Sequence, residues 1–296
     1  MSDSPASTYL FAHYGFDNQL QPQLTLQPGS SHEFTTISPR GQVLTLQFDM
    51  AQRFCTGWHE LTTGQNYSCP DNAMVVGNYD TCRHCQQKTG FNPAFYHATT
   101  ISAKQQARNA QPHSLYLAHF GPGVIKVGIS WAQRGLKRLL DQGARSGLIL
   151  GTYPTADAAR EWEARIARLP GFVETMQVRQ KQRLLGLPYD ADAAAQELLT
   201  ARQSLVQQHG LRPDDAKPLR MDPYYIGEAS FRPTQLLQVT NNSISGICLG
   251  MVGSIYIAQQ DDTPFALALG GFTGRLVRVS VTEQPNAHAP AQISLL

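Results

Sequence analysis

The sequence contains no long hydrophobic run and therefore no candidate for a membrane-spanning helix. No window of the 296 residues approaches the roughly 18 consecutive apolar residues that such a helix needs. The segment 1–16 also lacks the basic region followed by an apolar region that marks a secretory signal. With 42% hydrophobic residues, the chain is too apolar to be disordered and long enough to bury a core. We therefore expect a soluble, cytoplasmic protein with no membrane partner, built as two domains or as one domain with additions.

Cysteine is scarce as well, with five residues in the chain. In the reducing compartment that the missing signal predicts, metal ligands or core residues explain these cysteines better than disulfides do. Four of them fall within 31 residues, separated by 13, 12 and 2 residues, and are Cys55, Cys69, Cys82 and Cys85. The last pair has the Cys-x-x-Cys spacing that supplies two zinc ligands from one turn. This pattern predicts a four-cysteine Zn²⁺ site.

The expected zinc ion is structural rather than catalytic. Four thiolates complete a tetrahedral coordination sphere and leave no open position for water or substrate. His59 and His84 are competing ligands, and unliganded thiols or a redox pair are the alternative explanation. His84 lies inside the Cys82–Cys85 turn, where we expect it to point outward. Cys248 lies in an apolar segment and is expected to be a small buried side chain.

The chain has a net charge of only +2, but this balance hides a basic centre. Residues 102–186 hold thirteen Lys and Arg against five Asp and Glu, a net charge of +8. The flanking segments, 1–101 and 187–296, each have a net charge of −3. A basic centre favours a polyanionic partner, because Lys and Arg attract phosphates and release their counterions. A solvated helical surface rich in arginine explains the same distribution equally well.

The hydrophobic pattern predicts an α+β protein with four regions. Residues 1–101 form a β-rich region with the zinc site, and residues 113–170 a central domain. Residues 171–212 form a helical extension, with helices over about 173–185 and 191–209, and residues 213–296 a glycine-rich β region. The expected strands of the first region, an antiparallel meander, cover 24–26, 34–37 and 43–48, and those of the last cover 236–239, 244–250, 254–258, 265–269 and 276–279. The sequence leaves open whether the first and last regions share one sheet.

The central domain has a predicted β-β-α-β-α order. Strands over 115–118 and 124–129 are joined by a Gly-Pro-Gly segment, which predicts a hairpin. A basic helix follows over about 133–142, and then a short strand at 148–150. Thr155 is a good N-cap for a last helix that reaches residue 169.

Four short motifs of this domain belong together. They are Ser114-Leu115-Tyr116, Lys126-Val127-Gly128, Arg134 with Arg138-Leu139, and the helical stretch Ala159-Arg160-Glu161-Trp162-Glu163-Ala164-Arg165-Ile166. In this order they resemble the GIY-YIG nuclease superfamily. The resemblance implies a hairpin that presents a tyrosine, a helix whose arginine faces the scissile phosphate, and a later helix whose glutamate holds a divalent cation. Carried over position by position, it implies Tyr116 as the tyrosine, Arg138 (or Arg134) as the arginine, and Glu163 as the ligand of Mg²⁺ or Mn²⁺.

This sequence departs from the superfamily at a position that matters for chemistry. Lys126 stands where the second motif has a tyrosine, so a phenol that could help to activate water is replaced by a cation. Glu161 and Glu163 point about 200° apart on a helix, so at most one of them faces a site. Tyr116 on its short strand could equally pack its ring in the core.

Five features lie along the whole chain: a β-rich start, the four spaced cysteines, the strand Lys126-Val127-Gly128-Ile129-Ser130, the helix end Asp141-Gln142-Gly143-Ala144 and a glycine-rich β tail. Together they resemble a bacterial family, the domain of unknown function DUF2797. That family has no settled activity, so the resemblance implies an architecture and leaves the function to the residues themselves.

Together these patterns predict a zinc-stabilised protein that binds nucleic acid, DNA or RNA, through its central domain. The expected contacts are Lys126, Arg134, Lys137, Arg138 and Arg145. The alternative is a GIY-YIG-type nuclease with Tyr116, Lys126, Arg138 and Glu163 at its catalytic site and Mg²⁺ or Mn²⁺ as the cofactor. A scaffold that binds a protein partner is the third hypothesis. The first two differ in whether the site turns over, and Lys126 in place of the second tyrosine favours binding. The most informative observation is whether Tyr116, Arg138 and Glu163 lie in one cleft.

Overall fold

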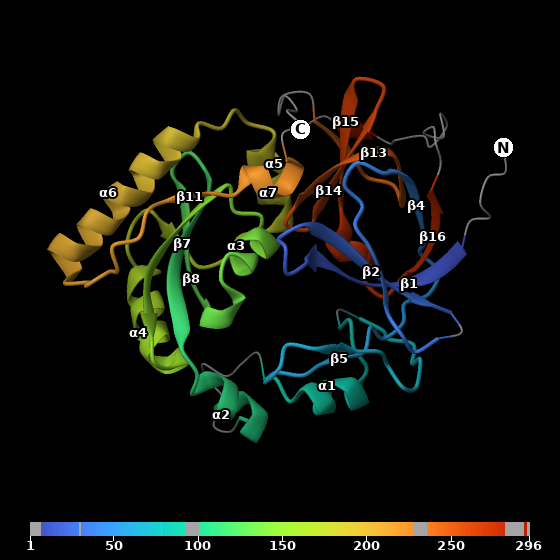
Figure 1. Cartoon of the computed structure of the whole chain (residues 1–296), viewed down its shortest axis with the longest axis horizontal. Helices are drawn as coiled ribbons and strands as arrows, with labels where there is room; N and C mark the ends of the chain where they lie inside the picture. Colours follow the sequence, from blue (N-terminus) through green and yellow to red (C-terminus); the bar gives the residue numbers. More distant parts are fainter. Residues whose placement is uncertain are drawn as a thin grey trace.

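The protein is built on two β-sheets and a small cysteine-rich module, as the computed structural model shows (Figure 1). The structure describes residues 7–29, 31–77, 79–92, 101–227, 236–281 and 293–294. Within these residues, no helix is both long enough and apolar enough to cross a membrane. The α+β class predicted from the sequence is confirmed.

The larger sheet has ten strands and joins the two ends of the chain. In spatial order they are β17 (Ile293–Ser294), β12 (Leu237–Val239), β15 (Thr263–Ala268), β14 (Ile255–Gln260), β13 (Ser243–Val252), β4 (Val43–Asp49), β16 (Leu276–Val281), β1 (Ser7–Phe16), β2 (Pro22–Pro28) and β3 (Thr35–Ile37). A short 3-10 helix, η3 (Leu269–Phe272), connects β15 to β16. On β4, Leu46 is registered with Ile244 of β13 on one side and with Val279 of β16 on the other. Strands from 1–101 and from 213–296 therefore share one sheet.

The position of β4 corrects the predicted meander. β1, β2 and β3 are sequential antiparallel neighbours, but β4 lies between two C-terminal strands and does not pair with β3. Its alternating side chains Leu44, Leu46 and Phe48 are fully buried. Such alternation specifies a strand and its buried face but not its neighbours, so the sequence alone placed β4 beside the strand that precedes it.

The smaller sheet has five strands, and its hairpin and helices follow the predicted β-β-α-β-α order. In spatial order the strands are β10 (Phe172–Val173), β8 (Val124–Trp131), β7 (His113–Gly121), β9 (Ser146–Tyr153) and β11 (Leu219–Arg220), and the two helices of the order are α3 (Lys137–Gln142) and α4 (Ala156–Ile166). The predicted helix over 133–142 is divided, because residues Ala132–Arg134 form a 3-10 turn, η1, that ends at Gly135 with a φ of 47°. Thr155 caps α4 as expected, and its hydroxyl oxygen accepts the Ala158 N–H at 3.2 Å.

Helices cover both faces of the smaller sheet (Figure 1). α4 and α6 (Ala191–His209) cover one face, where Leu115 and Leu117 of β7 belong to the same hydrophobic cluster as Ile166 and Leu198. Tyr116 lies between these two leucines on β7 and therefore points to the opposite face of the sheet. There α3, α5 (Val178–Leu185) and α7 (Asp222–Ile226) lie between the two sheets and join them in one core.

The cysteine-rich module follows β4 in the chain and contains little regular structure. It holds β5 (Trp58–His59), β6 (Asn66–Tyr67) and α1 (Arg83–Thr89), and α2 (Ala103–Asn109) lies between it and β7 in the chain. The rings of Trp58 and Tyr67 stack with their centroids 4.3 Å apart. Neither α1 nor α2 is predicted from the sequence, because each has seven residues and no apolar stripe of helical period.

The β7–β8 hairpin packs a tyrosine ring across a glycine. Tyr116 is registered opposite Gly128. A Cβ atom at position 128 would lie 2.4 Å from the Tyr116 Oη and 2.6 Å from its Cζ, which is closer than atoms can approach. Because Tyr116 is only 1% exposed, its ring has little free volume into which to move. The Lys-Val-Gly motif thus has a packing role, since its glycine leaves room for the tyrosine.

Replacing Gly128 tests this packing. We expect Gly128→Ala to lower the free energy of unfolding by about 1–3 kcal/mol, because overpacking shifts the ring or the backbone. Gly29→Ala is the matched control, since nothing lies within 4 Å of a Cβ atom there, and its effect should stay below about 0.5 kcal/mol. Urea unfolding followed by circular dichroism measures both variants. Equal stability of the two would show that the Tyr116 ring tolerates a side chain at position 128.

Candidate functional site

The four cysteines predicted from their spacing converge in the module. One Sγ atom from each of Cys55, Cys69, Cys82 and Cys85 lies within 4.8 Å of the others, and those of Cys69 and Cys82 are 3.9 Å apart. A tetrahedral ion with metal–sulfur bonds of ~2.3 Å requires sulfurs about 3.8 Å apart. All four are free thiols, and Cys82 and Cys85 come from the N-cap and first turn of α1. The cluster could hold a metal ion such as zinc.

The environment of the thiols suits ligands that share one cation. Burial raises the pKa of Cys55 to about 11 and raises the pKa of Cys85 strongly, so the uncharged thiols are favoured while no positive charge is near. At Cys82 burial also acts to raise the pKa, but hydrogen bonds from the Cys85 backbone and from the neighbouring thiols outweigh it and leave the pKa lowered. The N–H groups of Cys82 and Gly57 lie 3.1 and 3.4 Å from the Cys55 sulfur and donate to it. Bonds of this kind stabilise a thiolate.

The two competing histidines lie outside the cluster. His84 is exposed, as expected from its place inside the Cys82–Cys85 turn, and its Nδ1 lies 2.9 Å from Asp71. His59 has its Nδ1 at 2.9 Å from the side-chain oxygen of Asn66. Neither ring belongs to the group of four converging ligand atoms, so the donor set consists of sulfur alone.

The second group of predicted residues surrounds the Tyr116 hydroxyl. Its oxygen accepts a hydrogen bond from Gln142 Nε2 at 2.6 Å and a longer one from Arg138 Nε at 3.4 Å. Both donors come from α3, and the fold therefore brings Tyr116 and Arg138 together from β7 and from the helix after the hairpin. Arg138 is partly exposed, whereas Tyr116 is buried. Sequence reasoning did not identify Gln142 as a partner of the phenol.

Lys126 lies on β8 beside this group. Its ammonium donates to the backbone oxygens of Val127 at 3.1 Å and of Glu174 at 2.5 Å. Burial lowers the pKa of Lys126, while the charge of Glu163 acts to raise it and that of Arg138 acts to lower it again. Lys126 thus interacts electrostatically with both Glu163 and Arg138.

Glu163 is the one glutamate of its helical pair that faces the fold. It is 7% exposed, and its Oε1 accepts the Ile129 N–H of β8 at 3.2 Å. Glu161 is exposed, so the two carboxylates point apart as the helical period requires. The fold therefore brings Tyr116 of β7 and Arg138 of α3 into contact, and it places Lys126 of β8 within charge range of both Arg138 and Glu163 of α4.

A third cation, Lys181 of α5, belongs to the same neighbourhood and was missed by sequence reasoning. Burial, followed by the charges of Lys126 and Arg138, lowers the pKa of Lys181 to about 8. Its ammonium lies 5.4 Å from the centroid of the Phe120 ring. The sequence does contain a signal for this position of Lys181. Leu184 and Leu185 follow it by three and four residues, and residues at this spacing share one face of a helix, here the buried face of α5.

The other predicted cations have different surroundings. Arg134 pairs with Asp141 at 2.6 Å. Arg145 is 9% exposed, and its Nε and Nη2 bind the two carboxylate oxygens of Asp222, each at 2.6 Å, while its guanidinium lies over the Tyr189 ring. This bidentate ion pair occupies Nε and Nη2 and leaves the buried Nη1 without a partner among the described residues, so the nucleic-acid contact through Arg145 stays a prediction.

Comparison with known proteins bears on the whole chain rather than on one site. No curated protein and no solved structure matches this sequence. Residues 41–262 match the family described as "Protein of unknown function (DUF2797)". The match begins just before β4 and ends after β14, so it includes the four cysteines and the complete smaller sheet. Because it covers well over half of the chain, this protein belongs to the DUF2797 family.

Proposed function

We propose that this protein is a zinc-stabilised nucleic-acid-binding protein that binds a backbone phosphate beside its smaller sheet. The observation that carries the proposal is the group around Lys126: Arg138, 3.4 Å from the Tyr116 hydroxyl, and Glu163 both lie within its charge range. Their order resembles that of the functional residues of GIY-YIG nucleases, with Lys126 in place of the second tyrosine and the arginine displaced from its usual interval. Fold likeness alone assigns no activity, so the argument rests on the chemistry of these side chains.

The charges of this group favour an anionic ligand. Lys126, Arg138 and Lys181 are partly exposed cations within range of one another's charge, and one buried carboxylate, that of Glu163, lies beside them. Mutual repulsion between cations is relieved when an anion binds among them, and a phosphodiester offers two oxygens for the purpose. Three clustered cations therefore form a local phosphate site within the basic segment of the chain.

The same geometry favours binding over cleavage. The Tyr116 hydroxyl is buried and already accepts two hydrogen bonds, so it has no direct access to water. Lys126 stands where a second phenol would help with proton transfer, and an ammonium supplies charge without serving as a base. A site of this composition holds a phosphate and has a poor means of activating a nucleophile.

We further propose that the four-cysteine cluster holds Zn²⁺ with a structural role. Zinc accepts four thiolates in tetrahedral geometry, and the mutual separations of the four sulfur atoms suit that arrangement. The module has short elements and few buried aliphatic side chains, so metal–sulfur bonds would supply what a hydrophobic core supplies elsewhere.

Metal analysis tests the zinc assignment. We expect close to one equivalent of zinc per chain, and we expect Cys82→Ser to lose both the metal and part of the thermal stability, because metal binding contributes to folding free energy. Cys248→Ala is the control, since Cys248 lies on β13 outside the cluster and should retain the zinc. Inductively coupled plasma mass spectrometry and differential scanning fluorimetry give the two readouts. Fully folded, metal-free protein under reducing conditions would refute the assignment.

Salt-dependent binding tests the phosphate site. We expect labelled oligonucleotides to bind with an affinity that falls steeply as salt rises, and Lys126→Ala combined with Arg138→Ala to weaken binding and flatten the salt dependence. Each lost phosphate contact should reduce the slope of log K against log salt by about 0.7 for single strands and about 0.9 for duplexes. Fluorescence anisotropy over single- and double-stranded DNA and RNA also identifies the preferred strand type.

The control for this experiment removes the same kind of charge elsewhere. Arg278 is exposed on β16 of the larger sheet, and Arg278→Ala should leave the slope unchanged. Absence of binding at low salt, or equal effects of the site and control substitutions, would contradict the proposal and favour a scaffold that binds a protein partner.

One observation supports metal-dependent cleavage as the second candidate function. The Glu163 carboxylate lies within charge range of Lys126, in the position that the resemblance gives to the ligand of Mg²⁺ or Mn²⁺. Glu163→Gln retains an oxygen that can accept the Ile129 N–H and removes the charge. Since the phenol is buried, we expect binding without cleavage in the unmodified protein under either metal. Cleavage that requires Mg²⁺ or Mn²⁺ and is lost in Glu163→Gln, with binding retained, would instead establish a nuclease.

A further inference from the structure

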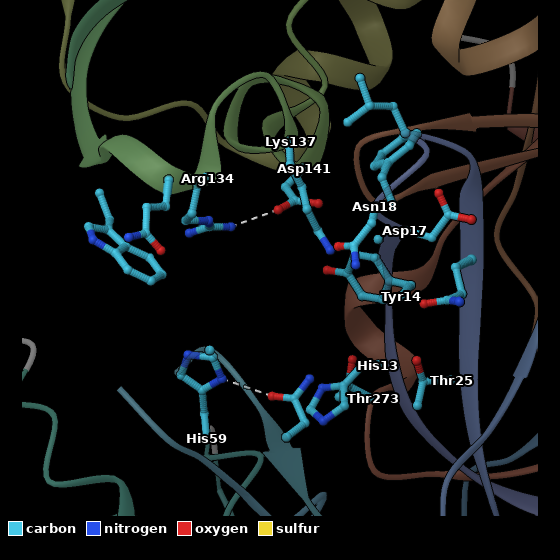
Figure 2. Close-up of a pocket in the computed structure, with 18 of the residues that line it drawn as sticks. His13, Tyr14, Asp17, Asn18, Thr25, His59, Arg134, Lys137, Asp141 and Thr273 are labelled. Atoms are coloured by element: carbon cyan, nitrogen blue, oxygen red, sulfur yellow. Dashed lines mark hydrogen bonds and ion pairs between the residues drawn. The ribbon is translucent and has the colours of Figure 1, made fainter. Parts of the chain in front are cut away.

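A cavity of about 670 Å³ lies where the larger sheet, the cysteine-rich module and the helix after the hairpin meet (Figure 2). Its wall includes the end of β1 and the loop that follows, the β5–β6 segment of the module, Arg108 of α2, and the segment from Trp131 to Asp141. This volume is within the usual range of small-molecule sites, and such sites favour junctions between structural units. Neither the cysteine cluster nor the Tyr116 group lines the cavity.

Arg108 lines this cavity, and its guanidinium takes part in none of the ion pairs of the described residues. The group lies over the Trp131 indole, with Cζ 3.4 Å from the ring centroid. Its Nη1 is buried and has no hydrogen-bond partner among the described residues. Burial, followed by the charge of Arg134, lowers the pKa of Arg108 to about 10, so the group remains a cation at neutral pH. Because Nη1 has almost no accessible surface, an anion in the cavity would be bound by the rest of the guanidinium, through charge-assisted hydrogen bonds.

The acidic groups of the cavity wall already have partners. Asp141 pairs with Arg134 at 2.6 Å, and Asp80 pairs with Arg53. Asp17 accepts two backbone N–H groups of its own turn at 2.8 and 2.9 Å. Arginines therefore neutralise Asp141 and Asp80, whereas Asp17 keeps its negative charge. Arg108 and Lys137 are two cations of the wall without an ion pair among the described residues, so the wall keeps an excess of positive charge.

Lys137 is the second available cation. None of the ion pairs of the described residues includes Lys137 or Arg108. Figure 2 shows the Lys137 and Arg134 side chains entering the cavity from the helix side, across from His59 and His13. Burial, followed by the charge of His59, lowers the pKa of His13 to about 4, so His13 contributes a neutral hydrogen-bonding ring to the opposite wall.

The remaining wall offers both hydrogen-bond donors and acceptors. Four amide side chains line the cavity, those of Asn18, Gln23, Asn66 and Gln133, together with the aromatic ring of Tyr14, and the Asn66 oxygen is already paired with His59. Amides pair with the mixed donor and acceptor edges of nucleobases, and guanidinium and ammonium groups bind phosphate. The wall thus combines the two recognition elements that a nucleotide requires.

We propose that this cavity binds a nucleoside phosphate, with its phosphate at Arg108 and Lys137 and its base or sugar against the amide side chains. The inference goes beyond the proposed function and does not depend on it. The phosphate site beside the smaller sheet uses Lys126, Arg138 and Lys181, and none of these residues lines the cavity. Such a ligand comes from one of two sources, a free nucleotide or the 5′-terminal nucleotide of a strand. Both present the same phosphate monoester to the cavity.

Calorimetric titration of the full chain tests the site. We expect adenosine 5′-monophosphate to bind with a dissociation constant below about 1 mM, and adenosine to bind at least about ten-fold more weakly, because it lacks the phosphate. Inorganic phosphate should compete with the nucleotide. Adenosine that binds as tightly as its monophosphate, or no binding of the monophosphate below about 1 mM, would overturn the proposal.

Two variants and a matched control assign the binding to these residues. Arg108→Ala should weaken the monophosphate about ten-fold or more, and Lys137→Ala, a substitution of a partly exposed side chain that should not affect folding, about five-fold. Arg165→Ala is the control, since the Arg165 guanidinium also lies over an indole, that of Trp162 at 4.6 Å, but outside the cavity. Equal affinities of Lys137→Ala and the control would count against the site even if Arg108→Ala were unstable.

Competition by oligonucleotides separates the two sources. Displacement of the monophosphate by a 5′-phosphorylated strand but not by its 5′-hydroxyl counterpart supports a strand terminus, and failure of both strands to displace it supports a free nucleotide. Displacement by both strands equally would contradict recognition of a phosphate monoester. Strand binding that depends on Arg138 in a protein that binds no monophosphate would refute this site and leave the proposed function standing. The reverse result would keep the site and refute the proposed function.

Discussion

The pairing of β4 with β13 on one edge and β16 on the other is the constraint on which the remaining structure depends. It joins Leu46 to Ile244 and Val279, residues about two hundred positions away in the chain, within one sheet. Everything between β4 and β12 must therefore leave the sheet and return to it. Non-local pairings of this kind require a large loop to close before any contact forms, and they are stable because the buried strand gains partners on both sides.

The segment between β4 and β12 contains the smaller sheet, and the two faces of this sheet pack against different partners. One face packs against α4 and α6 and forms a core of its own. The other face shares a core with the larger sheet through α3, α5 and α7. Tyr116 belongs to this second face, where Gly128 leaves room for its ring and Gln142 and Arg138 bind its hydroxyl. Tyr116 is thus a core residue, while the neighbouring cations Lys126, Arg138 and Lys181 remain partly exposed.

The cysteine-rich module depends on a different source of stability. Its cluster of buried groups consists of cysteines with a few partly buried neighbours, so the four sulfurs occupy the position that aliphatic side chains hold elsewhere. The module also places His59 and Asn66 at the cavity that it shares with β1 and α3. That cavity exists only in the assembled protein, because its wall comes from segments that are far apart in sequence. Metal binding by the cysteines would therefore stabilise one wall of a site that contains none of them.

The sequence by itself determined the features that local physics encodes. Alternating and helical periods predicted the α+β class and the β-β-α-β-α order, Thr155 predicted the start of α4, and the spacing of the cysteines predicted their convergence. The helical period also required that Glu161 and Glu163 point apart. Only the tertiary structure decided which strands flank β4, that Arg145 is buried against Asp222, and that Lys181 joins Lys126 and Arg138. The physical reason is that a local pattern specifies an element and its buried face, whereas the partner of a strand or of a charge is chosen by packing between segments that the sequence keeps far apart.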